Sequence, residues 1–448
     1  MRVMLVDSGE IYLERTRAMG KPYPHSGIGY LATTLVEEGY QVTIVDMAAQ
    51  QLSRNDVADL IRKTHPDVVA ISSMTYAILC AYSIAEAAKS AGCTVIAGGV
   101  HPTLLPERTL KECSSIDYIV CGEGEAALPA LLAHLESDHI DTLPNVAYRT
   151  ETQIKKNPVH YIQNLDDLPF PDWSLFDYSL YYRLPTDEGE IALYQINSSR
   201  GCPYTCTFCS PLHGKKVRFR SAENLVQEMK VNHEQFNARH FDFADSNATL
   251  HKKNFMAMCT LLGKEGLSDE VGWSIDTHVN HVDKALLEQA AKAGLKFMSI
   301  GVESGDQTLL RHIGKKITLP AIEKTIKTAT ALGIRVKCSL LLGHPYETLE
   351  TAKKTFEFAL YLRKKYGIEY YYNLVDVYPG THLYSMVEQG EGGARWISGK
   401  RNNWAAYRRD EPMIEVNDLT EEVLQTLYRQ YTQVLDEQRG SSFYEGGE

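Results

Sequence analysis

The sequence predicts an α/β protein made of two successive domains, each built on a sheet of parallel strands. Its 448 residues are about three times the usual length of one domain. Short apolar runs alternate with helix-length segments twice along the chain, once before residue 136 and again after residue 190. With 44% hydrophobic and 23% charged residues, the composition is that of an ordinary globular protein. Both halves are therefore expected to contain βα units around a buried core.

The first domain is expected over residues 1–136 as a five-stranded, Rossmann-like (flavodoxin-like) fold. Its apolar runs show almost no polar alternation, which is typical of parallel strands buried on both faces. The segments between them end near Gly or Lys, as helices often do. Ligands of such a sheet bind beyond the carboxyl ends of its strands. The five runs are RVMLVD at the start of the chain and residues 41–47, 67–73, 94–100 and 117–122.

Residues 137–190 lose this rhythm and are expected to form a linker, because Pro169 and Pro171 disfavour regular structure. The second domain, residues 191–385, has six strand candidates separated by helices, which predicts a partial (β/α)6 barrel. Residues 386–448 are expected to form a short helical C-terminal region. The six strand candidates are residues 193–198, 240–245, 272–277, 296–303, 335–343 and 369–377.

Charge and hydropathy disfavour two kinds of partner. The 46 Lys and Arg and 57 Asp and Glu give a net charge of -11, which opposes binding by neutralisation of nucleic-acid phosphates. The start, MRVMLVDSGEIYL, lacks a basic segment followed by an apolar stretch, and no run of about 18 apolar residues occurs. We therefore expect a cytoplasmic protein with a small-molecule substrate and with no nucleic-acid or membrane partner. Its nine cysteines are then expected to be free of disulfides.

Three of the cysteines stand together in SSRGCPYTCTFCS, directly after a strand candidate. Cys202, Cys206 and Cys209 can converge on one inorganic cluster at the mouth of the barrel. Three thiolates suit a 4Fe-4S cluster with one iron left open, whereas a closed zinc or ferredoxin site needs a fourth Cys or His. A zinc site completed by a distant residue such as His213 is the alternative.

This loop resembles the CxxxCxxC loop of the radical SAM superfamily, which has an aromatic residue before its last cysteine, here Phe208. The resemblance implies a radical SAM barrel in which the three cysteines hold a 4Fe-4S cluster and the open iron chelates S-adenosylmethionine. Reductive cleavage of this cofactor then yields a 5'-deoxyadenosyl radical. An electron donor such as flavodoxin or ferredoxin is implied as a partner.

Further segments resemble the same family in their order and spacing. FADSNAT would place Asp245 near the methionyl end of the cofactor, and GVESG would place Glu303 and Ser304 at its ribose. LLLGHPYET would line the adenine with Gly343 and Pro345.

The chain also departs from the family pattern at two positions. In WSIDTHV, His278 stands where relatives often carry an arginine that contacts the methionyl carboxylate, which makes this histidine a cofactor-binding candidate. Ser246 stands where a second acid is common. Neither departure affects the cluster ligands.

The first domain resembles the cobalamin-binding module that precedes the barrel in one radical SAM subgroup, the class B type. The resemblance rests on PHSGIGYLA, SSMTY, GGVHPTLLPE and GEGE. Relatives that have kept this fold without the cofactor share these motifs. No DxHxxG motif is present, so ligation of cobalt by a histidine is not expected. His25 and His101 are only nominal candidates for such a ligand. The resemblance places Ser72 and Thr75 against the corrin and Gly98, Gly99, His101, Gly122 and Glu123 near the nucleotide tail.

Two residues are candidates for a catalytic role. Tyr76 should follow the third strand and face the lower side of a bound corrin, or else pack against the next helix. Cys338 lies on a barrel strand, where it could donate a hydrogen atom to a radical intermediate or act as a small hydrophobic residue. By strand alternation, either Tyr371 or the pair Tyr370 and Tyr372 should face the inside of the barrel.

The predicted function is cobalamin-dependent C-methylation of an unactivated carbon of a small molecule, in natural-product biosynthesis. The alternative is a cobalamin-independent dehydratase, deoxygenase or rearranging enzyme acting on a sugar-like, aminoglycoside-type diol. A nonenzymatic cobalamin carrier or electron-transfer protein would not explain the adenine and ribose motifs.

Overall fold

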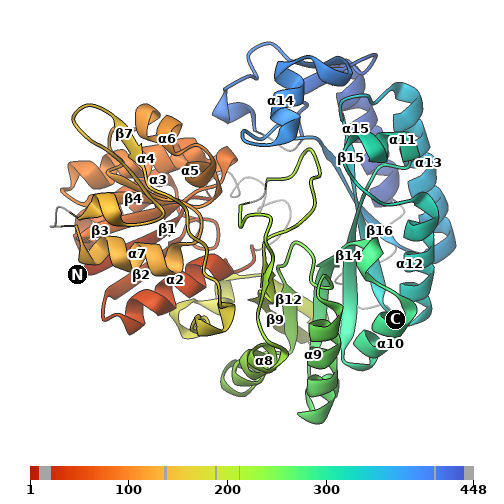
Figure 1. Cartoon of the computed structure of the whole chain (residues 1–448), viewed down its shortest axis with the longest axis horizontal. Helices are drawn as coiled ribbons and strands as arrows, with labels where there is room; N and C mark the ends of the chain where they lie inside the picture. The colour runs from red at the N-terminus through yellow and green to blue at the C-terminus, as the bar shows by residue number, and fades with distance from the viewer. Residues whose placement is uncertain (10–21, 136–138, 187–188, 211, 408–409, 438–448) are drawn as a thin grey trace. The chain divides into compact units, whose positions relative to one another are not determined.

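The structure is a computed structural model that describes residues 1–9, 22–135, 139–186, 189–210, 212–407 and 410–437. Contacts between Cα atoms divide the chain into two units, Met1–Tyr182 and Arg183–Glu448. Each unit contains one seven-stranded sheet (Figure 1).

The sheet of the first unit has the strand order β2-β1-β3-β4-β5-β6-β7. The first five strands run parallel in the order expected of a flavodoxin-like fold, which confirms the predicted class. Helices cover both faces of this sheet (Figure 1). The strands are β1 (Arg2–Asp7), β2 (Gln41–Asp46), β3 (Val68–Ser72), β4 (Thr94–Gly98), β5 (Tyr118–Val120), β6 (Val146–Arg149) and β7 (Ile154–Lys156). The helices are α2 (Ser26–Glu37), α3 (Arg54–Thr64), α4 (Ile78–Ser90), α5 (Val100–Leu104), α6 (Pro106–Glu112) and α7 (Gly124–Ala133).

The segment expected to be a linker is largely part of the first unit. Strands β6 and β7 extend its sheet in antiparallel pairing. Farther along, the Tyr181 hydroxyl donates to Asp46 at 2.9 Å, and the Asp172 N–H donates to Thr33 at 2.7 Å. Strands of four and three residues leave too short an apolar pattern to be recognised in the sequence.

The second unit forms a half-barrel with the strand order β16-β15-β14-β13-β12-β9-β8. Six strands run parallel, as predicted, and the seventh, β8, pairs antiparallel with β9. Helices line the outer side of the arc of strands (Figure 1). The strands are β8 (Arg183–Thr186), β9 (Gly189–Ile196), β12 (His240–Phe243), β13 (Gly272–Thr277), β14 (Leu295–Glu303), β15 (Arg335–Leu342) and β16 (Glu369–Leu374). The helices are α8 (Ala222–Phe236), α9 (Lys252–Lys264), α10 (Lys284–Lys292), α11 (Gln307–His312), α12 (Leu319–Ala331) and α13 (Leu349–Tyr366).

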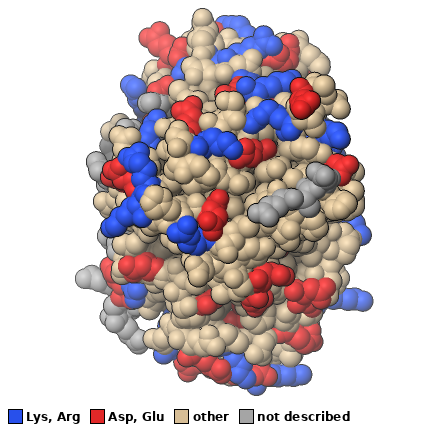
Figure 2. Space-filling view, turned by 90° about the vertical axis from the view of Figure 1, so that its left-hand side faces the viewer, with Lys and Arg blue, Asp and Glu red and all other residues tan. Residues whose placement is uncertain are grey.

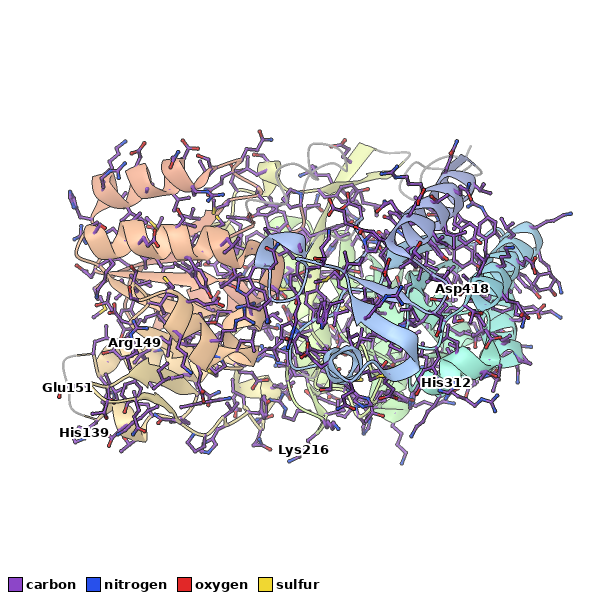
Figure 3. The ribbon with its side chains drawn as sticks, turned by 90° about the horizontal axis from the view of Figure 1, so that it is seen from above. His139, Arg149, Glu151, Lys216, His312 and Asp418 are labelled. Carbon is purple, nitrogen blue, oxygen red and sulfur yellow. The ribbon has the colours of Figure 1, made fainter. Side chains whose placement is uncertain are left out.

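The C-terminal region adds more than the expected helix to this unit. It contains α14 (His382–Glu388), the antiparallel pair β17 (Ala394–Trp396) and β18 (Ile414–Val416), and α15 (Glu421–Glu437). Tyr431 of α15 stacks on Phe356 with ring centroids 4.0 Å apart. Asp418 accepts from the Leu349 N–H at 3.2 Å at the start of α13 (Figure 3). These contacts attach the region to the outer helices of the half-barrel.

Charged side chains of both signs lie on the face shown in Figure 2. Of the helices in the described residues, none is long and apolar enough to span a membrane.

Candidate functional site

The cysteine loop follows β9 and is closed by a two-stranded ladder of β10 (Ser199–Arg200) and β11 (Arg218–Phe219). Gly201 opens the loop at φ +97°, and a Cβ there would lie 2.6 Å from the Lys216 carbonyl oxygen. Only glycine fits such a turn. The middle of the loop is held by Thr207, whose N–H donates to the Ile313 carbonyl at 3.0 Å and whose carbonyl accepts from Leu383 at 2.8 Å. The loop is therefore fixed by backbone contacts with α11 and α14.

Cys206 and Cys209 have several charged neighbours in common. Cys202 and Cys206 are half-buried and Cys209 is exposed. Desolvation by the surrounding protein raises the pKa of Cys206 and raises that of Cys209 to about 11, while Lys315 lowers both. Neighbouring cysteines add to the rise.

The spacing of these thiols bears on what they bind. Within the described residues, no three His, Cys, Asp or Glu side chains converge closely enough to hold one metal ion. A 4Fe-4S cluster spreads its thiolate ligands over several irons, whereas zinc gathers four ligands around one ion. Cys202, Cys206 and Cys209 supply the three thiolates that a 4Fe-4S cluster with one open iron requires, and their role as its ligands stays a prediction.

Asp245 lies directly under the cysteine loop. Its carboxylate accepts from the Ser198 N–H at 2.9 Å, the Ser198 hydroxyl at 3.0 Å and the Ser199 hydroxyl at 2.5 Å. Burial raises the pKa of this carboxyl, and the hydroxyl donors partly offset the rise. Asp245 thus anchors the strand that leads into the loop, and its contact with the methionyl end of the cofactor stays a prediction.

Glu303 ends β14 in a left-handed backbone conformation, with φ +66°. This conformation costs about 1 to 2 kcal/mol for a residue with a Cβ, and such strain is often retained at functional sites. The carboxylate lies 3.0 Å from Lys315 Nζ and accepts from the Ser339 hydroxyl at 3.1 Å. These contacts hold the carboxylate in place as a hydrogen-bond acceptor, and its contact with ribose stays a prediction.

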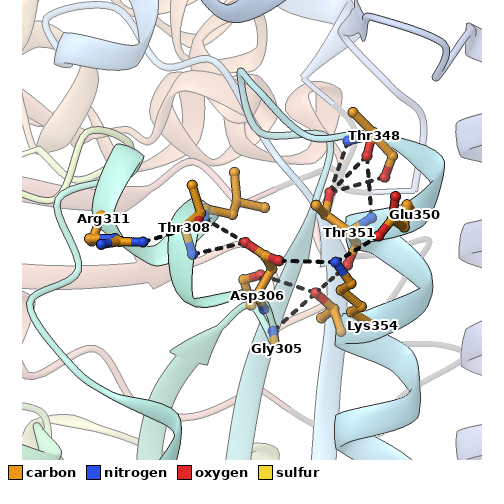
Figure 4. A network of polar contacts seen from close by, with 11 residues as sticks. Gly305, Asp306, Thr308, Arg311, Thr348, Glu350, Thr351 and Lys354 are labelled. Carbon is orange, nitrogen blue, oxygen red and sulfur yellow. Dashed lines mark hydrogen bonds and ion pairs between the residues drawn. The ribbon is translucent and has the colours of Figure 1, made fainter.

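The residues after Glu303 are tied to α13 (Figure 4). The Gly305 N–H donates to Thr355 Oγ1 at 3.0 Å, and Asp306 lies 3.8 Å from Lys354 (Figure 4). Ser304 is fully buried, and its hydroxyl lies 3.0 Å from that of Thr355. Ser304 is therefore engaged in holding the loop, and a contact between its side chain and ribose stays a prediction.

The turn after β15, predicted to line the adenine, lies beside the aromatic residue of the cysteine loop. Gly343 takes φ +100°, and Glu347 accepts from the backbone N–H groups of Gly343 at 2.6 Å and His344 at 3.1 Å. Pro345 is buried in this turn. The ring of Phe208, in the cysteine loop, lies 5.5 Å from that of His344. The aromatic residue of the cysteine loop and the glycine-proline turn thus share one location.

His278 packs against the cysteine loop. Its ring stacks on Tyr204 at 4.2 Å between centroids, and the Tyr204 hydroxyl contacts His281 Nε2 at 2.5 Å. Burial lowers the pKa of His278 to about 4, so the ring is neutral near pH 7. The histidine therefore does not reproduce the positive charge of the arginine that stands at this position in the family pattern described above.

The inner face of the half-barrel is polar. Asp276 is exposed, yet desolvation raises the pKa of its carboxyl to about 7, with Asp242 adding to the rise. A side chain with both properties lines a solvent-accessible interior. Lys337 is buried with Nζ 3.0 Å from the centroid of the Tyr371 ring, which is 45% exposed. Tyr371 is thus the tyrosine of β16 that faces inward.

Cys338 lies on the other face of β15. Its side chain is fully buried between Val336 and Leu340, and burial raises the pKa of its thiol. Strand alternation sends Lys337 and Ser339 to the inner face instead. The structure therefore does not bring Cys338 together with the polar residues inside the barrel.

In the first unit, the carboxyl ends of β3 and β4 form a tight backbone arrangement. Gly99 takes φ +83°, and a Cβ there would lie 2.8 Å from the Ser72 hydroxyl. His101 is buried, with Nδ1 3.3 Å from the Thr75 hydroxyl, and burial lowers its pKa to about 4. Gly98 has open space around its missing side chain, since only the Val120 carbonyl lies nearby at 3.6 Å. This edge fits a bulky ligand that approaches the backbone.

The remaining residues predicted at this edge differ in their burial and in the contacts that they make. Gly122 takes φ +82°, and its N–H donates to Thr103 at 3.0 Å. Glu123 is buried and accepts from the Ile162 N–H at 2.8 Å, which is a bond within the unit. Tyr76 is half-buried in the single turn between β3 and α4, at the predicted edge. His25 caps α2, because its Nδ1 accepts from the Ile28 N–H at 3.2 Å.

A separate hollow of about 510 Å³ lies near the amino end of β5 in the first unit. Arg149, which lines it, donates to the carbonyls of Leu110 and Ser114 at 2.7 Å each (Figure 3). This end of the sheet is opposite to the one where ligands of such folds bind.

Sequence reasoning missed several residues that the structure places at these sites. Lys315, Tyr204 and His344 lie beside the cysteine loop or its adenine-lining turn, and Asp276 and Lys337 line the barrel. The signal available for Lys315 was the GKK segment that follows GVESG by a few residues.

Comparison with known proteins identifies both units. The radical SAM superfamily model matches residues 196–359, and the B12 binding domain model matches residues 16–132. An uncharacterized methyltransferase of Pyrococcus horikoshii is 30% identical over 423 residues, covering 92% of this chain and 88% of the relative. The anaerobic magnesium-protoporphyrin IX monomethyl ester cyclase of Rubrivivax gelatinosus is 31% identical over 349 residues, covering 75% and 62%. The methyltransferase TsrM from Kitasatospora setae, solved with cobalamin and a [4Fe-4S] cluster, superimposes with a TM-score of 0.69 at 17% identity, covering 87% and 78%.

The half-barrel and its three-cysteine loop define a radical SAM enzyme. More particularly, the chain belongs to the family of radical SAM enzymes with an N-terminal B12-binding domain, among which methyltransferase is the favoured activity. The expected cofactor set of a 4Fe-4S cluster, S-adenosylmethionine and cobalamin is confirmed as that of this family.

Proposed function

We propose that this enzyme is a cobalamin-dependent C-methyltransferase that acts on an unactivated carbon of a polar small molecule, in natural-product biosynthesis. The observation that carries the proposal is the similarity to a methyltransferase across 92% of the chain, which includes both units. When bound, the cluster with S-adenosylmethionine supplies the 5'-deoxyadenosyl radical and cobalamin supplies the methyl group.

The residues of the second unit would divide the binding of these groups. Cys202, Cys206 and Cys209 would hold the cluster, and Glu303 would accept hydrogen bonds from ribose hydroxyls. Phe208 and the Gly343–Pro345 turn would enclose adenine. Neutral His278 would donate to the methionyl carboxylate.

The interior of the barrel supports a polar substrate. Asp276 and Lys337 present opposite charges there, and Tyr371 offers a ring face beside the ammonium of Lys337. A hydrocarbon substrate would displace water from these charged groups, and removal of water from charged groups is costly.

The first unit would hold cobalamin at the edge formed by β3, β4 and β5. Ser72 and Thr75 would face the corrin, and the glycines Gly98 and Gly99 would let backbone N–H groups approach the phosphate of the nucleotide tail. An electron donor such as a flavodoxin or ferredoxin would reduce the cluster in the cytoplasm.

The test uses protein purified and reconstituted without oxygen, with iron, sulfide and hydroxocobalamin. We expect bound cobalamin after desalting, 5'-deoxyadenosine after reduction with dithionite, and a deuterated methyl group on cobalamin when the methyl of S-adenosylmethionine is deuterated. Absence of the label on retained cobalamin would contradict the methyltransferase proposal.

A second candidate is a cobalamin-independent dehydratase, deoxygenase or rearranging enzyme acting on a sugar-like diol. The polar interior of the barrel favours it, because Asp276 could take a proton from a substrate hydroxyl near pH 7. Protein that retains no cobalamin after desalting, yet forms 5'-deoxyadenosine and converts aminoglycoside-type diols, would support this candidate over methylation.

A further inference from the structure

Lys315 is a largely but not fully buried lysine to which the proposed function assigns no role. Its side chain is 11% exposed, and its Nζ lies 3.0 Å from Glu303 Oε1. Gly301 lies beneath this ion pair, and a Cβ there would clash with both the ammonium and the carboxylate. The Ser339 hydroxyl donates to the other oxygen of Glu303 at 3.1 Å. Strands β14 and β15 thus leave room for the pair and complete its hydrogen bonds.

The backbone just before Lys315 is attached to the cysteine loop. The Ile313 carbonyl accepts from the Thr207 N–H at 3.0 Å. Gly314 has φ +71°, and a Cβ there would lie 2.8 Å from the Thr205 carbonyl oxygen and 3.6 Å from Cys206 Cα. The position of Lys315 relative to the thiols is therefore set by the same contacts that hold the loop.

The ammonium of Lys315 keeps its charge at this position beside the cysteine loop. Burial opposes the charge of Lys315 itself, but Glu303 and Cys206 raise its pKa above the ordinary value, so the ammonium stays protonated. His278 is neutral, as described above, and adds no charge.

We propose that Lys315 is the fixed positive charge of the cluster site, held by Glu303, and that it favours the reduced form of the cluster. One electron from the reductant adds one negative charge to the cluster, and no bond is made or broken. A buried cation beside the thiolates stabilises this extra charge more than a solvated one would, because the surrounding protein screens less than water. This role requires that Cys202, Cys206 and Cys209 hold the cluster, as proposed above.

The test is the midpoint potential of the cluster in the reconstituted protein without S-adenosylmethionine, from titration with dithionite followed by electron paramagnetic resonance. In Lys315→Met we expect the equilibrium for reduction to fall by at least about tenfold, which is about 59 mV for one electron. Lys315→Arg should keep the potential of the wild type. Lys316→Met is the matched control, because Lys316 is the exposed neighbour and loses the same charge.

Glu303→Gln tests a change of charge of the opposite sign. It removes a negative charge beside the thiolates and should raise the potential, and Lys315→Met/Glu303→Gln should lie between the two single variants. A Lys315→Met protein with full iron content and the wild-type potential would overturn the proposal. If Lys315→Met binds no cluster, an unchanged potential in Glu303→Gln would overturn the proposal instead. Wild-type protein that binds no cluster would contradict the proposed function itself.

Discussion

The two candidate sites of this enzyme are built from different kinds of contact. At the cysteine loop, buried side chains from distant segments meet, as in the pair of Glu303 with Lys315 and the bonds of Asp245 to the serines before the loop. At the edge of the first sheet, backbone conformation dominates. Gly99 has φ +83° and ψ -164° there, a conformation that essentially only glycine adopts, and the Ser73 carbonyl accepts from the His101 N–H at 3.1 Å.

This difference predicts how each site responds to change. A site held by buried charges and hydrogen bonds depends on charge and pH, because each buried polar group needs its partner. A site held by close backbone approaches depends on steric fit, because a single added methyl group has nowhere to go. Variants of the two kinds should therefore damage one site and spare the other.

The largest effect is expected for Cys206→Ala. Two remaining thiolates are too few to hold the cluster, so iron should fall from about four atoms per chain to a small fraction. Cleavage of S-adenosylmethionine should be lost with it, while cobalamin retention by the first unit should be unchanged. Iron analysis and a 5'-deoxyadenosine assay measure both. Cys259→Ala is the control, because Cys259 is buried in α9, outside the loop. Full iron in Cys206→Ala would contradict the ligand assignment.

Gly99→Ala should reverse this pattern. An alanine at φ +83° and ψ -164° costs about 1 to 3 kcal/mol, and the clash with Ser72 and Ser73 adds about 1 to 3 kcal/mol. Unfolding in urea should show a loss of about 2 to 6 kcal/mol in the first unit, and cobalamin should be lost on desalting, with iron retained.

Gly92→Ala separates strain from crowding in that experiment. Gly92 has φ +84°, nearly that of Gly99, but nothing lies within 4 Å of its missing Cβ. Gly92→Ala should therefore lower the free energy of unfolding only by the cost of placing alanine at a positive φ, about 1 to 2 kcal/mol. Equal losses in the two variants would show that close packing at Gly99 plays no part.

The sequence predicted the parallel strands of both sheets closely because their apolar runs are bounded by turns, whereas the antiparallel strands β6, β7 and β8 were missed. For β13 the predicted and observed bounds coincide at Gly272–Thr277. It predicted the position of the site residues along the chain but not the direction of their side chains. Ser304 is turned toward Thr355, 51 residues away, and such packing has no local sequence signal. The Lys315 and Glu303 pair was missed for a related reason, since α11 brings the two together only in the fold.

Glu347→Gln should show the dependence on pH expected of the second unit. Burial raises the pKa of Glu347 from 4.5 to about 7, although the N–H groups of Gly343 and His344 lower it. Between these values the folded protein keeps a proton that the unfolded chain has released, so stability falls as pH rises through this window. Glutamine has no such proton. The free energy of unfolding of the variant should therefore increase relative to that of the wild type as pH rises, by up to about 3 kcal/mol at pH 7.

Urea unfolding at a series of pH values checks this expectation. The difference in unfolding free energy between Glu347→Gln and the wild type should grow from about pH 4.5 to about pH 7 and then level off. A difference that does not change with pH would show that Glu347 is ionised in the folded protein throughout.

The smallest effect on stability is expected at Tyr76, whose substitution tests the proposed cobalamin site of the first unit most directly. Tyr76 is half-buried in the turn between β3 and α4, at the edge where ligands of this fold bind. Its ring would lie against the lower face of the corrin and keep water and histidine away from cobalt. Tyr76→Ala should then change the absorbance spectrum of bound cobalamin and slow methylation, with stability altered by about 1 kcal/mol or less. Iron content and 5'-deoxyadenosine formation should stay as in the wild type.

The control for Tyr76 is Tyr40→Ala. Tyr40 is also half-buried but lies just before β2, at the opposite edge of the same sheet. Removing its ring should leave the cobalamin spectrum unchanged. If Tyr76→Ala binds cobalamin with the wild-type spectrum, the ring only packs against α4. If the wild-type protein retains no cobalamin after reconstitution and desalting, yet converts substrate, the role of Tyr76 and the methyltransferase proposal are both wrong. The second unit alone would then account for the chemistry, since the described backbone bonds of Cys202, Cys209 and Thr207 lie within that unit.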